Sequence, residues 1–216
     1  NGLLHPTTGK VTVNGVDVSE KTDEAKHMRH KVGMVFQYPE HQLFEETIAE
    51  DIAFGPKNLG LDAEEIDRRV REAMAFVGLD YDTYAERSPF HLSGGQMRRV
   101  AIAGVVAMEP DFLVLDEPSA GLDPFGREEI FEEIIKLHKE KDVTVILVSH
   151  NMEDISRMAN RLIVLDKGQI VLDGKPLDIF NHHRHVLQQV GVDVPPVSVL
   201  IESLRNRGLD VSNEVL

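Results

Sequence analysis

The run Phe112-Leu-Val-Leu-Asp116, followed at once by Glu117, restricts the possible folds of this chain more than any other feature. An unbroken apolar run of this length predicts a short strand buried on both faces, as in a parallel sheet covered by helices. Two adjacent carboxylates are costly to bury unless other groups compensate their charge. The run therefore predicts a core strand that delivers two acids to the carboxyl edge of a sheet.

Strands and helices are predicted to alternate along most of the chain. Other β-rich apolar runs predict strands at Lys10–Val13, Val32–Phe36 and Val143–Val148. Apolar residues at helical spacing predict helices at Ala63–Val77, Ser93–Met108 and Phe125–Lys141. Only one modest amphipathic helix is predicted between Gln37 and Ser93. This order predicts an α/β domain with a mainly parallel sheet, in which ligands bind beyond the carboxyl ends of the strands.

The pattern changes towards the end of the chain. A hairpin turn is predicted at Lys167-Gly168, and after Gly174 the periodicity weakens, apart from a short helix predicted at Val197–Arg207. We therefore expect a main domain over residues 1–174 and an appendage over residues 175–216. The histidines of this tail, and one further off, are expected to lie in solvated polar segments and to form no metal site: His182, His183, His185 and His138.

Composition excludes several classes of protein. The formal charge of −14 repels nucleic-acid phosphates, so we expect no nucleic acid among the partners. The absence of Cys excludes disulfides and thiolate metal sites. The longest apolar stretch, Val100–Met108, is far shorter than the about 20 residues that a spanning helix needs. Any link to a membrane is therefore expected to go through a partner.

The two carboxylates that end the apolar run suit different tasks. Because side chains alternate along a strand, Asp116 and Glu117 should point apart. Mg²⁺ prefers oxygen ligands and keeps several waters, which makes Asp116 a candidate ligand. Glu117 is a candidate to polarise a water that attacks a γ-phosphate. Two solvated acids at a strand end are the alternative interpretation.

A glycine motif, Leu92-Ser93-Gly94-Gly95-Gln96, precedes one of the predicted helices. Glycines let a ligand approach the backbone closely, and a helix N-terminus attracts anions. With the Ser93 hydroxyl as a further donor, the motif predicts an anion site. A plain helix cap after a glycine turn is the alternative.

His150 and Gln37 each follow a predicted strand at the edge where ligands bind. A His at this position can donate a hydrogen bond to a γ-phosphate. An amide oxygen can ligate Mg²⁺ or orient a water. Either residue alone is more often structural, so their functional interpretation depends on the acids and the glycine motif.

Taken in order, these pieces resemble the ATP-binding subunits of ABC transporters, over the chain from Asn1 to about Gly174. The matches are the Q-loop glutamine, the signature motif, the Walker B strand with its catalytic glutamate, the D-loop and the switch histidine: Gln37, Leu92–Gln96, Phe112–Glu117, Ser119–Asp123 and His150. The resemblance implies a P-loop NTPase-like α/β fold with a mainly parallel sheet and a helical signature subdomain at about 45–110.

The resemblance also implies an ATPase that uses ATP and Mg²⁺. Its catalytic residues are Glu117, His150 and Gln37, and its metal ligands are Asp116 and Gln37. Two such subunits, identical or paralogous, form a head-to-tail dimer with two ATP molecules at their interface. The nucleotide-binding residues that each subunit offers are Ser93, Gly94, Gly95, Gln96 and Asp123. The first four contact the ATP of the partner subunit, and Asp123 couples the two sites.

A narrower resemblance starts at the Q-loop. Gln37–Phe44 and Thr47–Asn58 are similar to energy-coupling-factor importers, which include cobalt, nickel and shared vitamin importers. It implies a peripheral ATPase at the cytoplasmic face of the membrane, bound to an integral membrane coupling subunit and a substrate-capture subunit. We expect the acids of this segment to meet basic side chains of the membrane subunit, with a solvated helix face as the alternative: Glu45, Glu46, Glu50 and Asp51.

The family's phosphate loop, G-x-x-x-x-G-K-[ST], does not occur in these 216 residues. The Gly-Lys pairs at Gly9-Lys10 and Gly174-Lys175 are followed by neither Ser nor Thr. We expect the loop just upstream of Asn1, which leaves the fold incomplete at its N-terminus and ATP binding weak or absent. Because Glu117 and His150 are intact, we interpret the sequence as a truncated record of a normal enzyme.

Other functions were weighed against this interpretation. A non-catalytic docking or regulatory subunit would explain the missing loop but not the intact Glu117. A DNA-maintenance ATPase shares the signature and Walker B motifs, but it carries long coiled coils that Gln37–Ser93 lacks. A translation factor of the same superfamily would need a second tandem copy. The sequence does not encode which substrate is transported.

Overall fold

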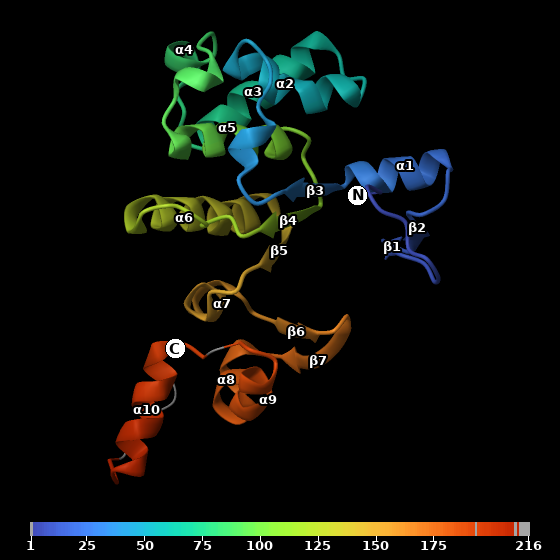
Figure 1. Cartoon of the computed structure of the whole chain (residues 1–216). Helices are drawn as coiled ribbons and strands as arrows, with labels where there is room; N and C mark the ends of the chain where they lie inside the picture. The colour runs from blue at the N-terminus through green and yellow to red at the C-terminus, as the bar shows by residue number, and fades with distance from the viewer. Residues whose placement is uncertain (1, 193, 210, 212–216) are drawn as a thin grey trace. The chain divides into compact units, whose positions relative to one another are not determined.

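The computed structural model describes residues 2–192, 194–209 and 211. The chain divides into two compact units, Asn1–Ile146 and Leu147–Leu216. Figure 1 shows the helices and strands of both units. The predicted boundary after Gly174 remains a proposal about domain organisation.

The sheet of the first unit has the strand order β3-β4-β5, with bounds Val32–Val35, Phe112–Asp116 and Thr144–Val148. Strands β3 and β4 are parallel, and Val35 pairs with Leu115. Leu113 and Leu115 are fully buried, which confirms that the apolar run forms a core strand. The predicted parallel sheet of an α/β fold is thus confirmed. A small antiparallel pair precedes it: β1 (Thr12–Val13) and β2 (Val16–Asp17).

The helices of the first unit lie between and after these strands. In chain order they are α1 (Asp23–His30), the 3₁₀ turn η1 (Pro39–Gln42), α2 (Ile48–Asn58), α3 (Ala63–Phe76), α4 (Tyr81–Tyr84), the 3₁₀ turn η2 (Pro89–His91), α5 (Gly94–Val106) and α6 (Pro124–Lys141). Helices α2 to α5 gather into one group at the top of Figure 1. Helix α5 begins within one residue of its prediction because Ser93 caps it.

The prediction of only one helix between Gln37 and Ser93 is wrong, because α2 was missed. Gly55 and Pro56 lie inside α2 and argue against a helix by propensity. Burial overrides that preference, since Ile48 and Ile52 are fully buried. A Cβ added to Gly55 would stand 2.7 Å from Cγ of Met108, so the glycine permits close packing against the end of α5.

The second unit is built from a hairpin and short helices. Its elements are α7 (Met152–Met158), β6 (Leu162–Asp166), β7 (Gln169–Gly174), α8 (Pro176–His182), α9 (Arg184–Gln189) and α10 (Pro196–Asn206). The predicted hairpin is confirmed: β6 and β7 pair antiparallel, and Lys167 and Gly168 have φ values of 48° and 77°. Positive φ at both positions is typical of a two-residue type I′ turn.

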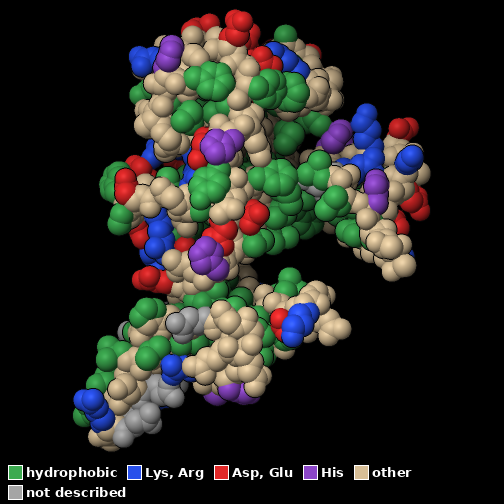
Figure 2. Space-filling model, viewed as in Figure 1, with side chains coloured by type: hydrophobic (Ala, Val, Ile, Leu, Met, Phe, Trp, Pro, Cys, Tyr) green, Lys and Arg blue, Asp and Glu red, His purple; other side chains and the backbone are tan. Residues whose placement is uncertain are grey.

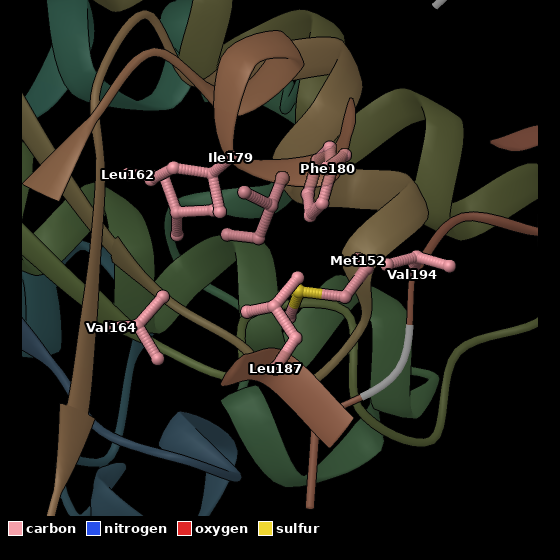
Figure 3. Packing of buried hydrophobic residues seen from close by; sticks show 8 residues of the cluster. Met152, Leu162, Val164, Ile179, Phe180, Leu187 and Val194 are labelled. Atoms are coloured by element: carbon pink, nitrogen blue, oxygen red, sulfur yellow. The ribbon is translucent and has the colours of Figure 1, made fainter. Parts of the chain in front are cut away.

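One hydrophobic core holds the second unit together (Figure 3). Leu162 and Val164 of β6 pack with Phe180 of α8 and Leu187 of α9. Residues before and after Gly174 therefore share this core. Across the described part of the chain, no helix is both long enough and apolar enough to cross a membrane.

Candidate functional site

The carboxyl edge of β3 and β4 brings three predicted site residues to one place. Val35 pairs with Leu115 in a parallel ladder, and each strand then ends within one residue. Gln37 therefore follows β3 at the same level at which Glu117 follows β4. Asp116 is the last residue of β4 and is half-buried, whereas Gln37 is exposed. This is the edge at which ligands bind in parallel sheets.

The backbone just beyond both strands adopts an unusual conformation. Tyr38 has φ of 57° and Glu117 has φ of 48°, in the left-handed region that side chains disfavour. The amide of Ala120 donates to the carbonyl oxygen of Glu117 at 3.0 Å, which closes a turn. Strained residues persist where the surrounding structure enforces them, and they cluster at functional sites. Two neighbouring strands that end in this way mark a candidate active site.

The donor set at this edge suits Mg²⁺ in part. Asp116 and Gln37 offer a carboxylate and an amide oxygen, which are ligand types that Mg²⁺ accepts. The described residues contain no group of three or more His, Cys, Asp or Glu side chains that could hold a metal ion. Such a set fits Mg²⁺ because this ion keeps several waters and is bound mainly through one or two carboxylates and substrate phosphates.

The signature motif forms the capped but sterically open N-terminus of helix α5. Ser93 Oγ accepts from the Gln96 amide at 3.3 Å, and Gln96 Oε1 accepts from the Ser93 amide at 3.1 Å, so the two residues form a capping box. Gln96 Nε2 also donates to Tyr84 Oη at 3.4 Å. A Cβ added at Gly94 or Gly95 would meet nothing within 4 Å. These glycines therefore leave open space at a helix N-terminus that favours anions.

Asp123 has a local structural task. It is the N-cap of α6, and its Oδ1 accepts from the amide of Gly126 at 2.8 Å. The side chain is nonetheless exposed. Capping fixes how the D-loop enters α6. The coupling role that the family resemblance implies for Asp123 stays a prediction.

His150 belongs to the second unit and lies directly after β5. Its backbone neighbours are fixed, since Ser149 Oγ accepts from the Asn151 amide at 3.0 Å. Asn151 in turn caps α7 and accepts from the Glu153 amide at 3.0 Å. The imidazole is exposed, as a residue that contacts a ligand requires. Its catalytic role stays a prediction.

Arg98 is the residue of this region that the sequence reasoning missed. It is only 2% exposed, although arginine is seldom fully buried. Its guanidinium donates to carbonyl oxygens that follow Glu117 and pairs with a carboxylate that follows Gln37. A signal was available, because Arg98 stands one helical turn before Ile102 and two before Val106 on the buried face of α5.

An aromatic and acidic segment follows the Q-loop. The rings of Phe44 and Phe54 meet edge to face with centroids 4.9 Å apart, and both remain exposed. Figure 2 shows hydrophobic side chains among acidic ones over this group of helices. Asp51 differs from its predicted role. It is 9% exposed, and its oxygens accept from the amides of Phe44 at 3.3 Å and Glu45 at 3.2 Å. Asp51 is therefore a buried residue that fixes the backbone of Phe44 and Glu45, rather than a surface acid that faces a partner.

Comparisons with known proteins identify the family. The family model described as ABC transporter matches residues 1–120. An energy-coupling factor transporter ATP-binding protein, EcfA2, from Clostridium perfringens (strain 13 / Type A) is 56% identical over 215 residues, spanning 100% of this chain and 75% of that protein.

Solved structures agree with this match. CbiO1 from Clostridium perfringens, part of the ABC transporter complex cbiONQ, superposes with a TM-score of 0.75 at 33% identity, covering 93% of this chain and 79% of that one. A dimeric ATP-binding cassette in a post-hydrolysis state bound to ADP and Pi gives a TM-score of 0.68 at 29% identity, covering 81% and 76%. The chain thus belongs to the ABC transporter ATPases, among the ATP-binding proteins of energy-coupling factor transporters.

Proposed function

We propose that the intact protein to which this chain belongs hydrolyses ATP to power import of a metal ion, cobalt or nickel, or of a vitamin through a partner membrane protein. The observation that carries the proposal is the shared edge of β3 and β4. There the Walker B acids and Gln37 follow two paired parallel strands, and the backbone beyond both is strained. Glu117 is the proposed general base, which polarises the attacking water.

Each predicted site residue has a proposed task. Asp116 and Gln37 hold Mg²⁺, which neutralises charge on the phosphates when it is bound. His150 donates a hydrogen bond to the γ-phosphate. The signature residues Ser93 to Gln96 contact the nucleotide of a second ATPase subunit, which is either a copy or a paralogue. Their open, capped helix start supports this task.

The partners follow from the surface around the Q-loop. The exposed rings of Phe44 and Phe54, with Glu45, Glu46 and Glu50 nearby in sequence, form the proposed contact with an integral membrane coupling subunit. Apolar rings supply buried area, and the acids select a basic partner surface. A separate substrate-capture subunit completes the importer. The chain is then peripheral, at the cytoplasmic face of the membrane.

The test is hydrolysis coupled to uptake. The protein is expressed with whatever its gene encodes upstream of Asn1, called here the full gene product, and reconstituted with its membrane partners in vesicles. ATP-dependent uptake with phosphate release supports the proposal. Normal assembly without phosphate release supports instead a non-catalytic docking subunit.

A further inference from the structure

Arg98 connects two turns that are far apart in the sequence. Its Nη1 donates to the carbonyl oxygens of Pro118 at 2.9 Å and Ala120 at 2.8 Å. Its Nε lies 3.3 Å from Glu40 Oε2, and its Nη2 lies 3.4 Å from Glu40 Oε1. The first pair of acceptors belongs to the turn after Glu117, and the carboxylate belongs to η1, just after Gln37. One planar guanidinium thus serves both turns.

The surroundings of this contact make it strong. The side chain of Arg98 is 3% exposed and that of Glu40 is 15% exposed, so water competes little for either charge. Breaking one partner of a buried pair leaves an uncompensated charge, which is strongly unfavourable. Two carbonyl acceptors and a carboxylate use the donors that arginine offers in a fixed fork. Lysine cannot reproduce this pattern with a single ammonium group.

The ring of Tyr38 also approaches the turn after Glu117. A Cβ built on Gly121 would stand 3.7 Å from Cε1 of Tyr38, so the ring lies beside the D-loop. Gly121 has φ of 74°, and Tyr38 has φ of 57°. The strained backbone at Tyr38 and Glu117 therefore lies within one region. Arg98 holds this region from α5 through its hydrogen bonds to both turns. The ring of Tyr38 lies beside the region at the surface.

We propose that Arg98 is a positioning residue for hydrolysis, which locks the turn after Gln37 to the turn after Glu117 so that the two move as one. This inference rests on the proposed function, because it names a further residue for the same site. A shift of η1 would reach the backbone of residues 118–120 through one side chain. Since Glu117 opens that turn, its position relative to the attacking water would shift as well.

The test compares neighbouring arginines of α5 in the full gene product. Arg99 is the matched control, because it is partly buried and pairs with Glu129 and Glu133 of α6 rather than with either turn. Arg98→Met should lower kcat for ATP at least about tenfold with KM changed less than threefold or so, and Arg98→Lys should recover only part of kcat. Arg99→Met should leave kcat near that of the wild type.

Backbone hydrogen exchange gives a readout that needs no activity. Glu40→Gln leaves the carbonyl bonds of Arg98 in place but removes the charge that anchors its other edge. We expect faster exchange at the amides of residues 119–122, which Glu40 reaches through Arg98, together with those of residues 38 and 40–42. Exchange confined to residues 38–42, or an Arg98→Met enzyme with wild-type kcat, overturns the positioning role. A wild-type protein that hydrolyses no ATP but shows the linked exchange overturns the proposed function and leaves the link standing.

Discussion

The two parts of the nucleotide machinery in this chain are built in opposite ways. The edge of β3 and β4 is braced, with strained residues held by Arg98 and with the ring of Tyr38 beside the D-loop. The start of α5 is open: Ser93 and Gln96 cap each other, and a Cβ added at Gly94 or Gly95 would meet no atom of the described residues within 4 Å. Catalytic groups need fixed positions before the reaction, whereas a surface that meets a partner needs room. We therefore predict that the first part works on this protein's own nucleotide and that the second contacts the nucleotide of another subunit.

The largest expected effect comes from a substitution that blocks the start of α5 without unfolding the protein. Gly95→Glu places a carboxylate where the γ-phosphate of a partner's ATP should lie, so hydrolysis should fall by at least about 100-fold. The melting temperature should stay level or rise, because acids stabilise helix N-termini and the site is open. Phosphate release and thermal unfolding of the full gene product check both expectations.

The matched control for this change is Ala63→Glu. Ala63 is exposed at the start of α3, after the Asp62 cap. An acid there should have the same small effect on stability and none on hydrolysis. A large loss of activity from Ala63→Glu, or a Gly95→Glu protein that hydrolyses ATP normally, would contradict the assignment of the α5 start to nucleotide binding.

The next effect concerns the segment around Phe44 and Asp51, which lies in the sequence between β3 and α5. Asp51→Asn keeps one acceptor oxygen and loses the charge, so one of the amides of Phe44 and Glu45 loses its partner. We expect a loss of about 1–3 kcal/mol in the free energy of unfolding and weaker capture of the membrane subunit. Burial raises the pKa of Asp51, so the folded wild type binds this proton more tightly than the unfolded chain, and acid should widen the stability difference between wild type and variant.

Glu50→Gln provides the comparison for Asp51. Glu50 is exposed and accepts from the Thr47 hydroxyl at 3.0 Å. This change should cost little stability, because exposed contacts of this kind contribute little. Equal losses from both variants in denaturant unfolding and in a pull-down with the membrane subunit would show that Asp51 does not hold the segment.

The last expected effect is confined to stability and tests how α5 is anchored on α6. Burial raises the pKa of Glu133 to about 7, and in the described part of the chain no hydrogen-bond partner is found for its Oε2. A raised pKa means that the folded state binds the proton more tightly, so stability is greatest below about 4.5 and declines as pH rises towards 7. Glu133→Gln should therefore add at most about 3 kcal/mol at pH 8 and little at pH 4.5.

Thermal unfolding at the two pH values checks this expectation. Glu129→Gln is the control, because Glu129 also pairs with Arg99 and its loss removes an attraction. It should bring no gain at pH 8. If Glu133→Gln lowers stability at pH 8 as much as Glu129→Gln does, the Glu133 carboxylate is stabilised by Arg99 more than it is penalised by burial.

The strands and the motifs could be predicted from the sequence, whereas helix α2 and the contacts of Arg98 could not. The strand at Phe112 and the helix after Ser93 follow from local patterns, an apolar run and a cap, and the structure confirms both. Helix α2 could not be predicted because tertiary packing overrides the preference of Gly55 and Pro56. The task of Arg98 could not be specified either, since its partners lie 20 to 58 residues away in the chain.

Single-turnover phosphate release from Glu117→Gln tests most directly whether Glu117 activates water at the edge of β3 and β4. The full gene product is loaded with ATP and Mg²⁺, and bound nucleotide and released phosphate are followed together. We expect the variant to bind ATP as the wild type does and to release phosphate at least about 100-fold more slowly. Wild-type phosphate release from Glu117→Gln would contradict this role of Glu117.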